Sequence, residues 1–115
     1  MEQLNRIELR GNVGTIRINK VSDNQVANFT LATNYVHKSR EGQPIMETTW
    51  FNVVAWGGKG MPADLNEIQK GSFLTVLGRM REVHYTTVDG VEKSSMEVVA
   101  SKVTVENPYQ APAEK

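Results

Sequence analysis

An alternation of apolar and polar side chains runs through most of this chain of 115 residues and restricts it to extended structure. Near the N-terminus the alternation changes phase at Gly14. The apolar positions are Ile7, Leu9, Gly11 and Val13 before this glycine, and Ile16 and Ile18 after it. Successive side chains of a strand point to opposite faces, so a change of phase at a glycine indicates a bulge or a sharp bend. We therefore expect one long first strand that turns a barrel corner at Gly14.

The same alternation predicts four further strands, at residues 26–35, 48–56, 72–85 and 93–105. Tight turns are expected near residues 23–24 and 88–91, because these positions contain Asp, Asn and Gly. Residues 36–48 are polar and contain one glycine and one proline, which predicts an exposed loop.

One short helix is expected between the third and fourth strands. Met61, Leu65 and Ile68 recur there at helical spacing. Pro62 suits the first turn of such a helix, and Gly71 suits the position just after its last turn. These positions allow a helix of about two turns.

The order of three strands, one short helix and two strands predicts an all-β fold, a five-stranded Greek-key OB-fold barrel. We expect residues 1–105 to form this domain, which is a usual length for a single domain. Residues 106–115 contain two prolines and no apolar pattern, so we expect them to form a flexible tail.

Composition and motifs argue against an enzyme. The chain has no cysteine, which excludes disulfides, cysteine-based zinc sites and thiol nucleophiles. Its two histidines, His37 and His84, have no second histidine or carboxylate at ligand spacing, so we expect no metal site. The glycine clusters 11–14 and 57–60 do not complete a phosphate-binding pattern. We therefore expect no catalytic residue and no cofactor.

Hydropathy and charge indicate a soluble, cytoplasmic protein. No segment approaches the roughly 18 apolar residues that would span a membrane, and the N-terminus lacks a basic segment followed by an apolar run. The chain has 13 basic and 13 acidic residues, but residues 1–81 hold ten against seven and residues 82–115 hold three against six. This uneven distribution predicts a modest basic surface and no polybasic arm.

Aromatic and basic residues gather in the second, third and fourth predicted strands. Trp50 and Trp56 share one face of the third strand, Tyr35 and His37 end the second, and Tyr85 ends the fourth. The basic residues between them are Lys38, Arg40, Lys59, Arg79 and Arg81. Aromatic platforms in a basic groove suit sequence-neutral binding of single strands, and an OB-fold binds on its second and third strands. Alternatively, both tryptophans belong to the core or to a protein interface.

Five segments carry motifs that stand in the order and spacing of a known family. They are residues 5–14 (NRIELRGNVG), 26–33 (VANFTLAT), 49–57 (TWFNVVAWG), 70–81 (KGS and VLGRMR at its two ends) and 97–100 (EVVA). Together they make the chain, over roughly residues 5–105, resemble the bacterial single-stranded DNA-binding proteins.

The resemblance implies an OB-fold homotetramer that wraps single-stranded DNA in replication, recombination and repair. The residues carried over by position are the stacking aromatics Trp50, Trp56, Tyr85 and His37, the basic residues Lys70 and Arg81, and a hydrogen-bonding Asn52. The imidazole of His37 is a weaker platform than the usual aromatic ring. Asn52 stands where many members carry a basic residue, so one phosphate contact is lost.

The C-terminal residues 110–115 (QAPAEK) depart from the pattern of the family. Members that recruit replication and repair enzymes end in an acidic tip with an apolar and aromatic pair, so such recruitment is not expected here. Two other functions stay open. One is a primosomal OB-fold protein of the same ancestry, and the other is an OB-fold module that binds only protein through its two tryptophans.

Overall fold

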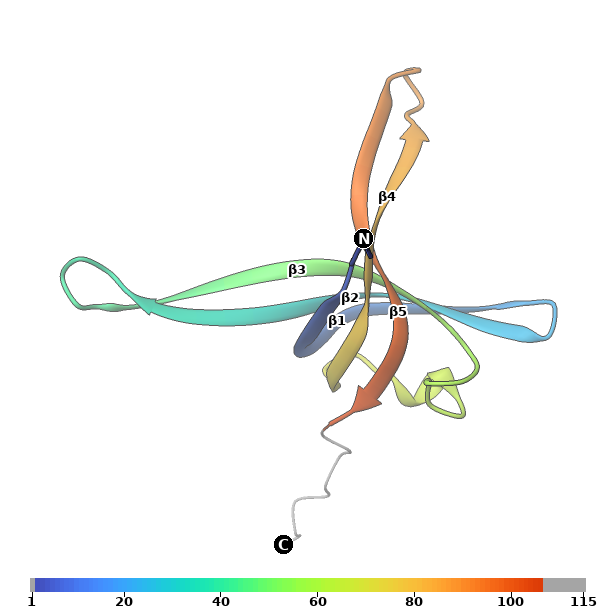
Figure 1. Cartoon of the computed structure of the whole chain (residues 1–115), viewed down its shortest axis with the longest axis horizontal. Coiled ribbons are helices and arrows are strands. Elements are labelled where there is room, and N and C mark those ends of the chain that lie inside the picture. Colours follow the sequence, from blue (N-terminus) through green and yellow to red (C-terminus); the bar gives the residue numbers. More distant parts are fainter. Residues whose placement is uncertain (1, 107–115) are drawn as a thin grey trace, which may run out of the picture.

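The computed structural model describes residues 2–106 as one barrel of five strands with three long projecting hairpins (Figure 1). The strands are β1 (Ile7–Val21), β2 (Asn24–Lys38), β3 (Pro44–Trp56), β4 (Phe73–Thr86) and β5 (Glu92–Val105), and the 3-10 helix η1 (Leu65–Glu67) lies between β3 and β4. Figure 1 shows the β1–β2 and β2–β3 hairpins extending to opposite sides and the β4–β5 hairpin rising between them.

The barrel closes in the strand order β1-β2-β3-β5-β4. All neighbouring strands are antiparallel except β3 and β5, which pair in parallel at Val53 with Val98 and at Val54 with Val99. β1 closes the barrel because it pairs with both β2 and β4. The predicted all-β, five-stranded barrel is therefore confirmed.

β1 bends where the sequence changes phase. Residues 7–12 pair with β4 and residues 12–21 pair with β2, and the register with β2 shifts between Val13 and Ile16. Gly11 permits a close approach of β1 to β2, because a Cβ built on it would lie 2.0 Å from the carbonyl oxygen of Ala32. The predicted bulge in the first strand is confirmed.

The core fills the barrel with apolar, mostly aliphatic, side chains from all five strands and from η1. Its fully buried members include Leu31, Leu65, Ile68, Leu74, Val76 and Val98. Among the described residues, no polar or charged side chain is buried. The polar and charged side chains of the described residues are therefore all at least partly exposed.

The predicted two-turn helix is wrong in length, because the segment between β3 and β4, which is fully described, forms only the single 3-10 turn η1. The Asp64 side chain accepts a hydrogen bond from the Asn66 backbone at its start, and Ile68 is already extended at its end. Leu65 and Ile68 still share a face, since a 3-10 helix repeats every three residues. Among the described residues, no helix has the length and hydrophobicity needed to cross a membrane.

The predicted loop at residues 36–48 is also too long. β2 continues to Lys38 and β3 begins at Pro44, so the connection is residues 39–43. Outside the barrel both faces of this β2–β3 ribbon meet solvent, and its residues need not alternate in polarity. Its strands are held by backbone pairing and by polar contacts such as Thr48 Oγ1 to Asn34 Oδ1 at 2.7 Å.

Of the expected tail at residues 106–115, the structure describes only Glu106. Its backbone N–H donates to the Phe73 carbonyl at 2.8 Å, and the Thr75 hydroxyl donates to its carboxylate at 2.7 Å. The prediction for residues 107–115 lies outside the described residues.

Candidate nucleic-acid interface

The outer face of β2 and β3 carries both tryptophans. Trp50 lies opposite Ala32 and Trp56 opposite Val26, and directly paired residues share a face of the sheet. Their exposed fractions are 58% and 48%. The other face of β3, with Phe51, Val53 and Ala55, packs into the barrel. The alternative that the two tryptophans are core residues is therefore wrong.

Trp50 is positioned by the bulge of β1. A Cβ built on Gly14 would lie 2.4 Å from Cζ3 and 2.8 Å from Cη2 of the Trp50 ring, so the ring lies against the bare backbone of this glycine. Beside it, the Thr15 N–H donates to the Thr30 hydroxyl oxygen at 2.9 Å. The phase change at Gly14 thus supplies both the barrel corner and the support for an exposed indole.

A second surface, which we call the hairpin face, lies on the β4–β5 hairpin. Arg81 lies opposite Glu97 and Tyr85 opposite Lys93, with Arg79 further along the same face. The Arg81 guanidinium forms an ion pair with the Glu97 carboxylate. Tyr85 is 46% exposed. This face therefore combines one aromatic platform with three basic side chains.

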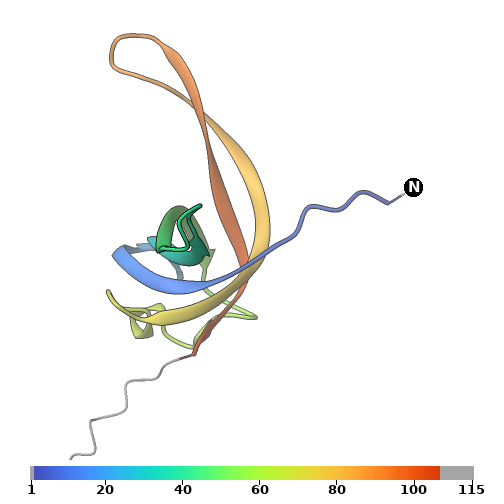
Figure 2. The same cartoon turned by 90° about the vertical axis from the view of Figure 1, so that its left-hand side faces the viewer.

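The outer face and the hairpin face meet in a depression of about 400 Å³. It is lined by Thr15, Ile16, Arg17, Asn28, Phe29, Thr30, Asn52, Val53, Val83, Ser95 and Glu97. In Figure 2 the β4–β5 hairpin curves over the side of the barrel on which the β2–β3 ribbon points toward the viewer. We call the region around this depression the concave surface. Asn52 lines it, Trp50 lies beside Thr30 and Gly14 at its edge, and Arg81 is ion-paired with Glu97. Tyr85 lies further out on the hairpin face.

The structure separates Tyr35 and His37 from this concave surface. Their rings stack with centroids 5.9 Å apart, and His37 Nε2 lies 4.0 Å from the Glu47 carboxylate. Tyr35 pairs with Glu47 and His37 with Ile45, which places both rings on the opposite face of the ribbon from Trp50. Lys38 ends β2 at the far end of this ribbon, followed by Arg40 in the 39–43 turn.

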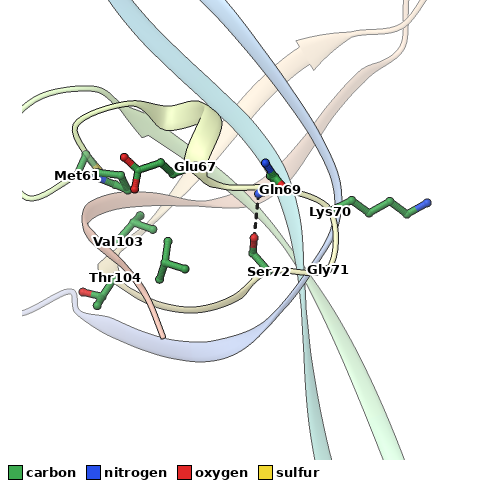
Figure 3. A pocket seen from close by; sticks show the side chains of 10 residues that line it. Met61, Glu67, Gln69, Lys70, Gly71, Ser72, Val103 and Thr104 are labelled. Carbon is green, nitrogen blue, oxygen red and sulfur yellow. Dashed lines mark hydrogen bonds between the residues drawn. The ribbon is translucent and has the colours of Figure 1, made fainter. Parts of the chain in front are cut away.

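The remaining predicted residues, Lys59 and Lys70, lie in the segment between β3 and β4. Lys70 borders a second pocket of about 740 Å³, from which its side chain extends away (Figure 3). The N–H of Gly71 donates to the Val13 carbonyl at 2.8 Å, so this segment lies beside the bulge of β1. Lys70 is therefore available to a strand that crosses β1, whereas the pocket beside it lies outside the two aromatic faces.

Several residues of the depression were missed by the sequence interpretation. Arg17, Thr15, Thr30 and Asn28 line it, and Lys93 lies opposite Tyr85. A signal for the β1 residues was present, since after the phase change the odd positions must face outward. The signal for Lys93 was absent, because only the register of β4 with β5 places it beside a tyrosine.

The described ionisable side chains offer no cluster for a metal ion at this surface. Within residues 2–106, no three His, Asp or Glu side chains lie close enough together to hold a metal ion. Hydrogen bonds from the Asn66 backbone, the Asn66 side chain and Gln25 lower the pKa of Asp64. That carboxylate caps η1 and lies outside the depression.

Comparison with known proteins assigns the family. The sequence profile of the single-strand binding protein family matches residues 4–106. The chain belongs to this family. A single-stranded DNA-binding protein of Xanthomonas campestris is 36% identical over 102 residues, which cover 87% of this chain and 59% of the relative. The single-stranded DNA-binding protein 3 of Clostridium acetobutylicum is 36% identical over 78 residues, which cover 68% and 51%.

Among solved structures, the single-strand binding protein of Plasmodium falciparum in complex with single-stranded DNA is similar to this family member. The TM-score is 0.68 and the sequence identity 27%, with 89% of this chain and 90% of the other chain covered. This chain spans under two thirds of the length of the Xanthomonas and Clostridium relatives. The part that matches the family profile, residues 4–106, contains all five strands of the barrel.

Proposed function

We propose that this barrel binds single-stranded DNA without sequence selection and protects it during replication, recombination and repair. The observation that carries the proposal is the exposure of aromatic rings on two neighbouring surfaces, Trp50 and Trp56 on the outer face and Tyr85 on the hairpin face. Membership of the single-strand binding protein family supports it. The proposed action is binding without catalysis, in the cytoplasm at the nucleoid.

In the proposed mechanism, aromatic rings bind the bases and basic side chains bind the phosphates. Bases stack on Trp50, Trp56 and Tyr85, and every base has a π-face that such rings accept. Trp50 and Trp56 are six residues apart on one strand, which corresponds to about 20 Å and leaves room for several nucleotides between them. The cations of the hairpin face, with Lys70, neutralise phosphates. Lys38, Arg40 and Lys59 extend this role along the ribbon and the loop after β3.

The test is a titration with oligothymidylate while tryptophan fluorescence is recorded. Stacking on Trp50 and Trp56 should quench their emission. The substitution Trp50→Ala should weaken binding by on the order of 1 to 3 kcal/mol, because it removes one platform. Trp50→Phe is the matched control and should keep most of the affinity, since the phenyl ring still offers a face. Binding without quenching would contradict the assigned platforms, and no binding at all would favour the protein-interaction module.

We also propose that the protein assembles as a homotetramer. Exposed apolar side chains on the projecting hairpins, such as Val36, Met46, Val91 and Met96, supply surface for contacts between copies. One OB-fold engages only about 4 to 16 nucleotides, so several barrels would be needed to wrap a long strand. Light scattering should return about four times the 12.9 kDa of one chain. A mass of one chain at micromolar concentration would contradict the assembly.

A further inference from the structure

The depression between the outer face and the hairpin face has an unusual lining for a surface that holds a polyanion. Most of its polar side chains are uncharged, namely Thr15, Asn28, Thr30, Asn52 and Ser95. Its charged groups are one cation, Arg17, and one anion, Glu97. The charges of Arg17 and Glu97 offset each other, so the lining as a whole carries no net charge that would hold a phosphate. The lining therefore suits a neutral group that donates and accepts hydrogen bonds.

Glu97 is fixed in its position on the floor of this concave surface. Its side chain is 22% exposed and its carboxylate is ion-paired with Arg81, across the β4–β5 ladder. A carboxylate has two oxygens with about four acceptor sites, so the contact with Arg81 leaves acceptor capacity free. In the parallel register of β3 and β5, Glu97 also lies next to Asn52, because the following residues Val53 and Val98 are paired.

We propose that the depression is a subsite for the edge of one nucleobase, in which the Glu97 carboxylate accepts a hydrogen bond from an exocyclic amino group. The proposal rests on the proposed single-strand binding and adds a preference to it. A volume of about 400 Å³ falls in the usual range of roughly 300 to 1,000 Å³ for small-molecule sites. Trp50 lies at the margin, against Gly14 and next to Thr30, so a neighbouring base can stack there.

The chemistry of the lining decides which bases are favoured. Asn28 and Asn52 carry amides that donate and accept, and the hydroxyls of Thr15 and Thr30 rotate, so these groups discriminate little. Glu97 only accepts, and a carboxylate pairs with the amino group at N4 of cytosine. Thymine lacks an exocyclic amino group and places two carbonyl oxygens beside its single N–H. The subsite should therefore favour amino-bearing bases over thymine.

The experiment compares an oligocytidylate and an oligothymidylate of equal length on the intact protein and on Glu97→Gln. The ratio of the two affinities should shift toward thymidylate by about fivefold in the variant, because the new amide can donate to a thymine carbonyl. Loss of a surface ion pair costs little, so the variant should fold normally. The ratio isolates base recognition, since removal of a negative charge strengthens phosphate binding equally for both oligonucleotides.

Glu82→Gln is the matched control. It removes the same charge from the same hairpin, but Glu82 lies on the other face, opposite Met96 and 3.6 Å from the imidazole of His84. This variant should leave the ratio unchanged. A ratio that is equally unchanged in Glu97→Gln would overturn the proposal while leaving single-strand binding intact.

A second arm changes the DNA and keeps the protein. An oligomer of N4,N4-dimethylcytosine lacks both amino hydrogens and should bind the intact protein about fivefold more weakly than oligocytidylate. The difference in affinity between the modified oligomer and unmodified oligocytidylate should be smaller for Glu97→Gln than for the intact protein. Equal affinity of the intact protein for both oligomers would contradict the amino contact. Failure of every oligonucleotide to bind would instead overturn the proposed function together with the subsite.

Discussion

At the scale of single residues, Gly14 joins the fold to the binding surface. Its position in the bulge bends β1, and its missing side chain makes room for the Trp50 ring. A Cβ at this position would come within 3.0 Å of both the ring and the Thr30 hydroxyl. The exposed ring can move more readily than the backbone of β1, which is paired with β2 on both sides of the bulge. A side chain at position 14 should consequently weaken DNA binding before it prevents folding.

Gly14→Ala is therefore expected to fold and to bind single-stranded DNA more weakly. The loss should not exceed the roughly 1 to 3 kcal/mol that a whole stacking platform contributes. The tryptophan emission of the free protein should also change, because the ring is displaced. Gly57→Ala is the control, since a Cβ there would meet its nearest neighbour, the Gln25 carbonyl oxygen, at an ordinary 3.5 Å. Equal affinities of the two variants would show that Gly14 does not position Trp50.

At the scale of elements, the sequence predicts the features that pack against the core and does not predict those that are exposed to solvent. The slip between Val13 and Ile16 was visible because inward positions of β1 must be apolar. The extensions of β2 to Lys38 and of β3 from Pro44 were invisible, because a ribbon wetted on both faces needs no alternation. The aromatic positions of the site could likewise be predicted, but their faces depend on cross-strand register.

Helix η1 depends on its cap more than on its length. Asp64 accepts hydrogen bonds from Asn66 and Gln25, which lower its pKa in the folded protein. A carboxyl group whose folded pKa is lowered contributes stability above its unfolded pKa, about 3.9, and loses that contribution as the pH falls through the folded pKa. Asp64→Asn keeps a good capping side chain without the titration. The free energy of unfolding, measured with urea, should therefore fall more steeply between pH 6 and about pH 3 in the wild type than in Asp64→Asn. Parallel curves would show that the cap carries no titrating contribution.

The two faces of the β2–β3 ribbon should differ in the length of DNA that they require. Tyr35 and His37 stack on the face opposite Trp50, so a strand reaches them only after crossing the edge of the ribbon. Tyr35→Ala should leave the affinity for an oligonucleotide of about 12 residues unchanged and weaken binding of one several times longer. Tyr85→Ala, on the hairpin face, should weaken both. Loss of short-oligonucleotide affinity in Tyr35→Ala would place this pair within the primary site.

At the scale of the whole molecule, the proposed binding of a polyanion by a chain of zero net charge depends on an uneven placement of its charges. Arg79, Arg81 and Lys93 share the hairpin face, while Lys102 lies elsewhere on the barrel, with Glu8 and Arg10. Glu97 offsets part of the charge of Arg81 through their ion pair. Each barrel can therefore neutralise only a few phosphates, and stacking must supply much of the remaining affinity.

The salt dependence of binding should accordingly be shallow and should respond to individual cations. Each neutralised phosphate contributes about 0.7 to the slope of log affinity against log salt for a single strand. Arg79→Ala should lower the slope by about this amount together with the affinity. Arg79 lies on the hairpin face, and its direct cross-strand neighbour is Val99, which is not a carboxylate. Lys102→Ala removes the same charge from a different part of the surface and should leave the slope unchanged. Titrations at four salt concentrations decide between these outcomes. An affinity that does not depend on salt concentration in any variant would mean that the surface binds an apolar partner. The aromatic faces would then serve a protein contact.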